Sequence, residues 1–340
     1  MFRKMTKSNQ KNHLKNGKLK YLYSADTTVS QYPILGSCVR ALGKGWRVLA
    51  ITSDDNHLTF QSLKDMLTSP NFLAIHYVRD FQPDTFARLE TPDVVLINSS
   101  PNSHQDGDLV KRVRDSFAGK CHIVVGGYGC HSGDFDLISQ FSQNKISTGG
   151  ITAFTGYGQG KSISAYGLAL LDVFSGNRVA IVQWFKEKEG TWRINEHYFS
   201  QTLRDPELVE FHPAGLGFYG SPDMDRVSGE KAYQQHKDKA YKGVELAMEL
   251  IDSGDYSCVV LDELLDTVPA IAENVQHPLI ELNAVISLLK HCRESDVQVI
   301  VTGRGISDAL EPLIRTSYSI TQIRHPYSEK GLLAVSGLDF

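Results

Sequence analysis

The segment Gly156-Tyr157-Gly158-Gln159-Gly160-Lys161-Ser162 has the composition of a phosphate-binding loop. A short β-branched and aromatic run, 151–154, precedes it, and a helix-forming stretch, 163–174, follows. In a strand–loop–helix unit the glycines let backbone N–H groups converge on phosphate oxygens, the lysine reaches the outer phosphates and the serine hydroxyl can bind Mg²⁺. The segment therefore predicts a nucleoside triphosphate site, and a flexible glycine turn is the competing interpretation.

The spacing of this loop is unusual. The general phosphate-loop pattern starts with a glycine five positions before the Gly-Lys pair, and Thr155 occupies that position here. This departure restricts the protein families to which the loop can belong.

Length and composition favour a cytoplasmic protein with a substantial core. The chain has 340 residues, of which 41% are hydrophobic, so two domains or one large domain are expected. No apolar run approaches the roughly 20 residues of a membrane span, and no apolar region follows the basic N-terminus. The absence of a Cys-x-x-Cys pair predicts buried free thiols rather than disulfides or a zinc site for the five cysteines, which are Cys38, Cys121, Cys130, Cys258 and Cys292.

The N-terminus differs from the rest of the chain in charge. Residues 1–20 contain seven basic side chains and no acidic one, and they include few apolar residues. Such a composition predicts a disordered basic tail over residues 1–18. A solvated tail or a mobile lid is favoured over a nucleic-acid-binding arm.

The chain contains an apparent internal repeat. Arg47-Val48-Leu49-Ala50-Ile51 matches Arg178-Val179-Ala180-Ile181-Val182, and this superposition also brings Gly36 onto Gly167. Three further pairs follow in the same order: 70–76 with 206–212, 93–98 with 257–263, and 123–129 with 299–305. Because β-branched runs followed by glycine recur in all α/β proteins, a chance resemblance among strands is the alternative.

Both halves alternate short apolar runs with helical patterns, which predicts mostly parallel sheets flanked by helices. We therefore expect an α/β fold with two tandem P-loop-type domains, 19–148 and 149–340. The first domain is degenerate in this alignment and lacks a nucleotide site. Its residues at the equivalent positions are Ser30 for Lys161, Ala25 for Gly156, Ile97 for Asp262 and Asn98 for Glu263.

Two segments of the second half can join the phosphate loop. The run 259–261 ends in Asp262 and Glu263, where a P-loop fold brings a carboxylate beside Mg²⁺. Since adjacent strand residues point to opposite faces, only one of the two acids is expected to face the metal. Arg304 follows the next strand and can pair with phosphate, or can lie in a surface turn.

The clearest helical pattern covers 229–253. His236 lies on its apolar face. This position is typical of a core histidine rather than of a metal ligand.

Residues 150–340 resemble the ATP:cob(I)alamin (corrinoid) adenosyltransferase family. The resemblance rests on six segments in the same order: the loop 154–162, including Thr155; Val182-Gln183-Trp184-Phe185-Lys186; the segment from Val209 to Phe218; Val260-Leu261-Asp262-Glu263-Leu264; Thr302-Gly303-Arg304-Gly305; and the ending from Arg324-His325-Pro326-Tyr327 to Phe340.

The resemblance implies transfer of the 5′-deoxyadenosyl group of ATP to a reduced Co(I) corrinoid, with release of triphosphate. It implies Mg²⁺, a corrinoid substrate and a flavoprotein reductant that supplies Co(I). The expected catalytic residues are Lys161, Glu263 and Arg304, and the expected metal ligands are Ser162, Asp262 and Glu263. The expected residues for ATP and corrinoid are Thr155, Gly156, Gly158, Gly160, Lys161, Ser162, Ile163, Gln183, Lys186, Phe218, Tyr219 and Arg304.

The chain departs from the usual family pattern at two positions. Gln159 stands where a lysine is usual, and Tyr219 stands where a tryptophan is usual in the corrinoid-side loop. A regulatory ATP- or corrinoid-binding protein without catalysis is therefore the alternative, followed by an ordinary P-loop phosphotransferase or ATPase. The family is dimeric, which suggests either a homodimer or an intrachain pseudo-dimer in which 19–148 is the silent partner. The tail or the segment 132–150 is then a candidate lid.

Overall fold

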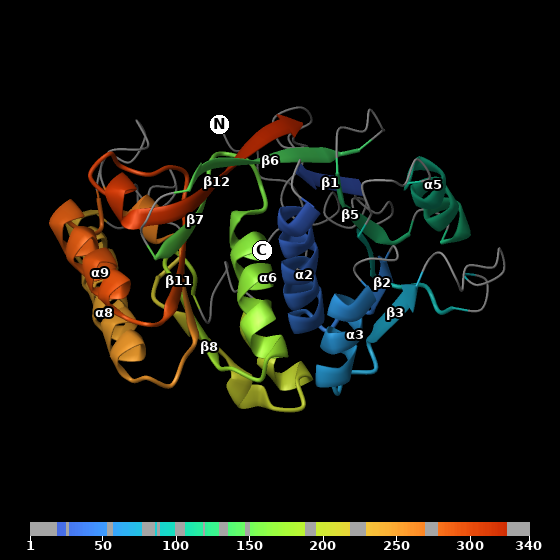
Figure 1. Ribbon diagram of the computed structural model, residues 1–340, viewed down its shortest axis with the longest axis horizontal. Coiled ribbons are helices and arrows are strands. Elements are labelled where there is room, and N and C mark those ends of the chain that lie inside the picture. Colours follow the sequence, from blue (N-terminus) through green and yellow to red (C-terminus); the bar gives the residue numbers. More distant parts are fainter. Residues whose placement is uncertain are drawn as a thin grey trace.

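The part of the chain that the computed structural model describes forms one twelve-stranded mixed sheet flanked by helices (Figure 1). The strand order is β3-β2-β4-β5-β1-β6-β12-β7-β11-β10-β8-β9. The structure describes residues 19–24, 27–52, 57–76, 86, 89–98, 106–117, 120–128, 135–146, 150–187, 195–217, 229–268 and 278–324. The predicted basic tail and the C-terminal segment after Arg324 lie outside these residues.

The first half of the chain, residues 19–146, supplies one side of the sheet. Its elements are β1 (Leu19–Ser24), α2 (Thr27–Gly43), β2 (Val48–Thr52), α3 (His57–Met66), β3 (Phe72–His76), β4 (Val94–Asn98), α5 (Asp106–Ser116), β5 (His122–Tyr128) and β6 (Leu137–Ile146).

The second half, residues 150–324, supplies the other side. Its elements are β7 (Ile151–Thr155), α6 (Lys161–Phe174), β8 (Val179–Gln183), β9 (Val209–Pro213), α8 (Gly229–Asp252), β10 (Cys258–Asp262), α9 (Leu282–Glu294), β11 (Gln298–Thr302) and β12 (Ile314–Arg324), with short 3₁₀ turns that include η3 (Glu196–Tyr198) and η6 (Leu264–Thr267).

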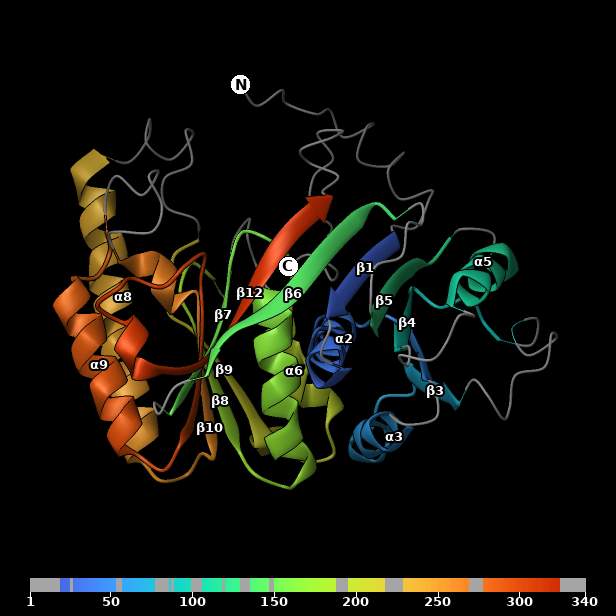
Figure 2. The ribbon, with the colours of Figure 1, turned by 45° about the horizontal axis from the view of Figure 1, so that its top comes forward.

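Helices cover both faces of the sheet (Figures 1 and 2). Strand residues alternate between the faces: in β10, Cys258 and Val260 pack toward α6, while Val259 and Leu261 pack toward α8 and α9. Helices α2, α3 and α6 share one apolar core, and this core contains residues from both halves of the chain. The opposite face carries a separate core in each half, under α5 in the first and under α8 and α9 in the second. The two halves are thus joined through a common core on one face.

The strand order is the same when it is followed inward from either edge. The first half reads β3-β2-β4-β5-β1-β6, and the second reads β9-β8-β10-β11-β7-β12, so the nth strand of one half occupies the place of the nth strand of the other. The central strands β6 and β12 are antiparallel, whereas all other neighbouring strands pair in parallel. The carboxyl ends of the parallel strands of the two halves therefore point in opposite directions.

The β6–β12 ladder has the pattern of an isologous contact. Phe141 pairs with Ile320 at its centre, and the flanking pairs Ser142–Ser319 and Gln140–Thr321 lie on either side. The central helices repeat the pattern, because a Cβ atom added at Gly36 would overlap the Ile163 carbonyl and one at Gly167 would overlap the Tyr32 carbonyl. Reciprocal contacts of this kind are those of a two-fold symmetric interface.

Several sequence predictions are confirmed. The fold is α/β with parallel strands flanked by helices, and the helix predicted over 229–253 is α8. His236 is buried, and burial lowers its pKa. Four of the five cysteines are buried free thiols, and Cys130 lies outside the described residues. None of the helices in the described ranges is long and apolar enough to cross a membrane.

Candidate functional site

The glycine loop connects the end of β7 to the start of α6, as predicted. Gly156 and Gly160 have φ angles of 98° and 124°, values that side chains rarely adopt. The loop lies against β12: the Gly158 N–H donates to the Ile320 carbonyl at 2.8 Å. A Cβ atom at Gly158 would approach Ile320 Cγ2 to 2.7 Å. The glycines are therefore required both by their backbone angles and by close contact with the strand behind them.

Lys161 is the first residue of α6. Its ammonium folds back over the loop and donates to the Gly158 carbonyl at 3.0 Å. Burial lowers the pKa of Lys161, and the nearby acid Asp266 opposes that shift. Ser162 follows on the first turn of the same helix, where the exposed N–H groups favour an anion.

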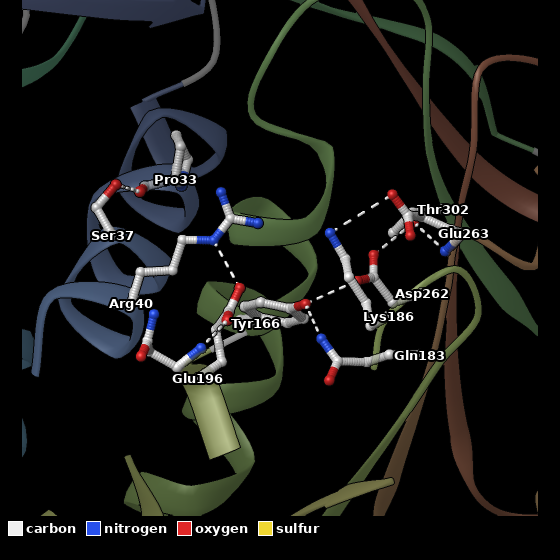
Figure 3. Close-up of polar contacts among 11 residues, drawn as sticks. Pro33, Ser37, Arg40, Tyr166, Gln183, Lys186, Glu196, Asp262, Glu263 and Thr302 are labelled. Carbon is white, nitrogen blue, oxygen red and sulfur yellow. Dashed lines mark hydrogen bonds and ion pairs between the residues drawn. The ribbon is translucent and has the colours of Figure 1, made fainter. Parts of the chain in front are cut away.

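A buried hydrogen-bond network lies beneath the loop at the ends of β8, β10 and β11 (Figure 3). Asp262 is fully buried and accepts at both carboxylate oxygens, from Tyr166 Oη at 2.7 Å and from Thr302 Oγ1 at 2.7 Å. Gln183 Nε2 donates to the same Tyr166 oxygen at 2.8 Å. These bonds fix the orientation of the Asp262 carboxylate.

Glu263 leaves the strand immediately after Asp262. It has φ of 64°, in the left-handed region that is strained for a glutamate, and its N–H donates to Thr302 Oγ1 at 2.7 Å. Its Oε1 lies 3.6 Å from Lys186 Nζ, and its Oε2 is buried without a hydrogen-bond partner among the described residues. Burial, opposed by Lys186, raises the pKa of Glu263 to about 7. Asp262 and Glu263 therefore have different surroundings because of this left-handed turn. Strand alternation, which the sequence had suggested as the reason, does not apply, since β10 ends at Asp262.

Arg304 and Asp266 complete the rim of this edge. The Arg304 N–H donates to Asp266 Oδ1 at 2.7 Å, and the Arg304 carbonyl accepts from the Gly156 N–H at 3.2 Å. Burial raises the pKa of Asp266, and among the charged side chains around Lys161 it is the one with the largest effect on the lysine pKa. Asp266 was not predicted from the sequence. The signal that could have identified it is an acidic residue in the short turn η6, which follows the acidic end of β10.

The first half of the chain also reaches this site. Lys20 Nζ, on β1, donates to Gln159 Oε1 at 3.3 Å. The ring of Phe141, on β6, lies where a Cβ atom at Gly160 would approach it to 2.7 Å. Ile163 is buried against α2. None of these first-half contacts was predicted from the sequence, because no local pattern links strands that are so far apart in the chain.

A second link between the halves is a buried ion pair. Arg40, on α2, donates through Nε to Glu196 Oε1 at 2.9 Å, and Glu196 is fully buried (Figure 3). Burial alone lowers the pKa of the Arg40 guanidinium, but Glu196 and other nearby groups outweigh burial and raise it. Glu196 and Arg40 lie near Tyr166, whose hydroxyl donates to Asp262 (Figure 3).

Most of the predicted site residues therefore lie together at the carboxyl edge of the second half. The structure brings Lys161, Ser162, Glu263 and Arg304 to this edge, and places Gln183 and Asp262 in the network beneath it. Thr155 is buried at the end of β7, with its hydroxyl 3.4 Å from the Tyr318 carbonyl to which it donates. Phe218 and Tyr219 lie outside the described residues.

Comparisons with known proteins identify the family. A family model described as ATP:corrinoid adenosyltransferase BtuR/CobO/CobP matches residues 147–340. Corrinoid adenosyltransferase CobA of Salmonella typhimurium is 30% identical over 205 residues, which cover 59% of this chain and 91% of that protein. The corrinoid adenosyltransferases of Pseudomonas aeruginosa and Escherichia coli are 29% and 27% identical, over 88% and 91% of their lengths. The chain belongs to the ATP:corrinoid adenosyltransferase family, and the resemblance inferred from the motifs is confirmed.

Proposed function

We propose that this protein transfers the 5′-deoxyadenosyl group of ATP to a reduced corrinoid and releases triphosphate. Family membership supports a transferase of this class over a non-catalytic regulatory protein. The observation that carries the proposal is the convergence of the glycine loop, Lys161, Glu263 and Arg304 at one edge of the sheet.

The reaction forms a cobalt–carbon bond at C5′ of ATP and breaks the bond between that carbon and the triphosphate oxygen. Because the corrinoid is the nucleophile, the protein has to orient the two substrates and stabilise the departing triphosphate. The loop N–H groups and Lys161 bind its phosphate oxygens, and Arg304 adds positive charge at the rim. The Lys186 ammonium lies 3.6 Å from Glu263 Oε1 and orients the Glu263 carboxylate.

The residues at this edge fit a magnesium ion. Ser162 offers a hydroxyl and Glu263 a carboxylate oxygen that is buried without a hydrogen-bond partner among the described residues, and oxygen ligands are those that Mg²⁺ prefers. Asp262, whose oxygens are already held by Tyr166 and Thr302, supports the site from beneath. Bound there, Mg²⁺ would neutralise charge on the triphosphate.

We also propose that the two halves are tandem P-loop-type copies, of which the first has lost its nucleotide site, and that they form an intrachain pseudo-dimer. The equal strand order and the reciprocal β6–β12 pairs support this proposal. The sheet register refines the alignment of the acids. Thr52 pairs with Asn98 as Gln183 pairs with Asp262, so Asn98 takes the place of Asp262 rather than of Glu263.

The pseudo-dimer predicts a chain that is monomeric in solution. Light scattering on the full chain should give a mass near 37.8 kDa. A stable particle of twice that mass would favour the homodimer instead.

The central experiment is a single-turnover assay with ATP, Mg²⁺ and chemically reduced cobalamin. Formation of adenosylcobalamin together with triphosphate supports adenosyl transfer. Binding of ATP without product would favour the regulatory alternative, and release of phosphate or diphosphate would favour a phosphotransferase or ATPase. Chemical reduction removes the need for the physiological reductant, which we propose to be a flavoprotein.

A further inference from the structure

The phosphate loop is backed by strands from both halves of the chain. Behind Gly156 and Gly158 lies Ile320 of β12, and behind Gly160 lies Phe141 of β6. Strand β1 is the next strand beyond β6 and pairs with it in parallel. Because the parallel strands of the two halves run in opposite directions, the amino end of β1 lies level with the carboxyl edge of the second half.

Lys20 lies at this amino end of β1. Its neighbours on the same face of the strand, Leu22 and Ser24, are buried in the same way. The lysine is 6% exposed, and its ammonium donates to Gln159 Oε1 at 3.3 Å across 139 positions of sequence. The side chain is thus directed at the middle of the loop from the other half of the molecule.

The chemistry of this contact matters because a triphosphate carries several negative charges. The Gln159 amide oxygen accepts this hydrogen bond and so positions the Lys20 ammonium at the loop. Within the loop itself Lys161 is the sole cationic side chain of residues 155–162. A second ammonium held at Gln159 would add charge to the same phosphate-binding surface.

We propose that Lys20 of the first half is a nucleotide-binding residue of the site in the second half, and that Gln159 positions it beside the phosphates of ATP. This inference rests on the proposed nucleotide site and deepens it, since it gives the silent half a direct part in binding. The ligand group that it contacts is the phosphate chain and not the adenosine.

The test is a calorimetric titration of ATP and of inorganic tripolyphosphate into the full-length protein. Lys20→Met should weaken both ligands about tenfold, because one charge-assisted contact is lost. Lys20→Arg should retain most of the affinity. The matched control is Lys64→Met, a substitution at an exposed lysine of the same half, which should leave both affinities unchanged.

A second substitution separates a binding role from a structural one. Gln159→Lys places an ammonium in the loop itself, so it should restore ATP affinity to the Lys20→Met protein. A merely structural role for Lys20 would lower the unfolding midpoint and would not be rescued in this way. Unchanged tripolyphosphate affinity in Lys20→Met would overturn the inference, as would a loss that Gln159→Lys does not repair.

The proposed function is tested separately, because it depends on the product of the turnover assay. A Lys20→Met protein with wild-type affinity that still makes adenosylcobalamin would refute the role of Lys20 alone. Weakened ATP binding without any adenosylcobalamin from the wild-type protein would refute the reaction and leave the role of Lys20 intact.

Discussion

The two halves of the chain place the same order of strands in the sheet but present different side chains at the strand ends. In the second half, Gln183 and Asp262 end β8 and β10, and the loop after β7 carries Lys161. In the first half the corresponding ends of β2 and β4 carry Thr52 and Asn98, which are buried and uncharged. An α/β sheet needs apolar strand interiors for its stability, whereas residues at the strand ends can change without loss of the core. The fold therefore persists in a half whose edge has no ionised groups at these positions.

Some of the contacts between the two halves are reciprocal, and others are not. The β6–β12 pairs and the Gly36 and Gly167 contacts are exchanged between the halves. The Arg40–Glu196 pair has no such counterpart, since the position in α6 that corresponds to Arg40 is Leu171. The shared backbone geometry thus coexists with side-chain contacts that serve the second half.

The largest expected effect contrasts the equivalent positions Lys161 and Ser30. Lys161→Ala should weaken ATP binding by about a hundredfold or more, because it removes the charged contact to the outer phosphates. Ser30→Ala should leave ATP affinity unchanged. Calorimetric titration of ATP into both variants measures the contrast. A comparable loss of affinity in Ser30→Ala would refute the proposal that the first half has lost its nucleotide site.

The next effect concerns the asymmetric ion pair. Arg40→Met should lower the free energy of unfolding by about 3–5 kcal/mol, because Glu196 is left as an unpaired buried charge. Leu171→Met at the equivalent position of α6 is the control and should cost below about 1.5 kcal/mol, because it conserves volume. Urea denaturation gives both values. Equal costs would show that the buried pair contributes little to joining the halves.

The reciprocal helix contact predicts equal costs at two sites. Gly36→Ala and Gly167→Ala should each destabilise by about 1–3 kcal/mol, since the added methyl group would overlap a carbonyl of the facing helix. Gly150→Ala, where a Cβ atom would meet nothing within 4 Å, is the neutral control. Thermal unfolding would contradict the two-fold relation if one glycine tolerated alanine and the other did not.

The smallest effect tests the network beneath the loop of the second half. Tyr166→Phe removes the hydroxyl that donates to Asp262 and accepts from Gln183, and it should cost about 1–2 kcal/mol of stability. Tyr157→Phe removes a hydroxyl from a side chain that is 66% exposed, and should cost less than about 0.5 kcal/mol. If the Tyr166 variant were as stable as the wild type, the Asp262 carboxylate would not depend on this bond.

Much of the site was predictable because its residues lie in short local patterns. The loop 156–162, the acidic end of the strand at Asp262 and the turn containing Arg304 each combine a strand signal with a functional side chain. Asp266 and Tyr166 were not predicted. They carry no motif, and their importance comes from side chains that the fold brings to them, Lys161 and Asp262 respectively.

The amino-acid sequence by itself determined the α/β class, the phosphate loop and the family, because these depend on periodicity and on residues adjacent in the chain. Only the tertiary structure decided how the halves meet. Strand order and register decide the contacts between the halves, which include Lys20 with Gln159, Arg40 with Glu196, and Phe141 with Ile320. Order and register are set by packing between segments more than a hundred residues apart. The left-handed turn at Glu263 was not anticipated for the same physical reason, because its strained backbone is held by a hydrogen bond to Thr302, on a neighbouring strand.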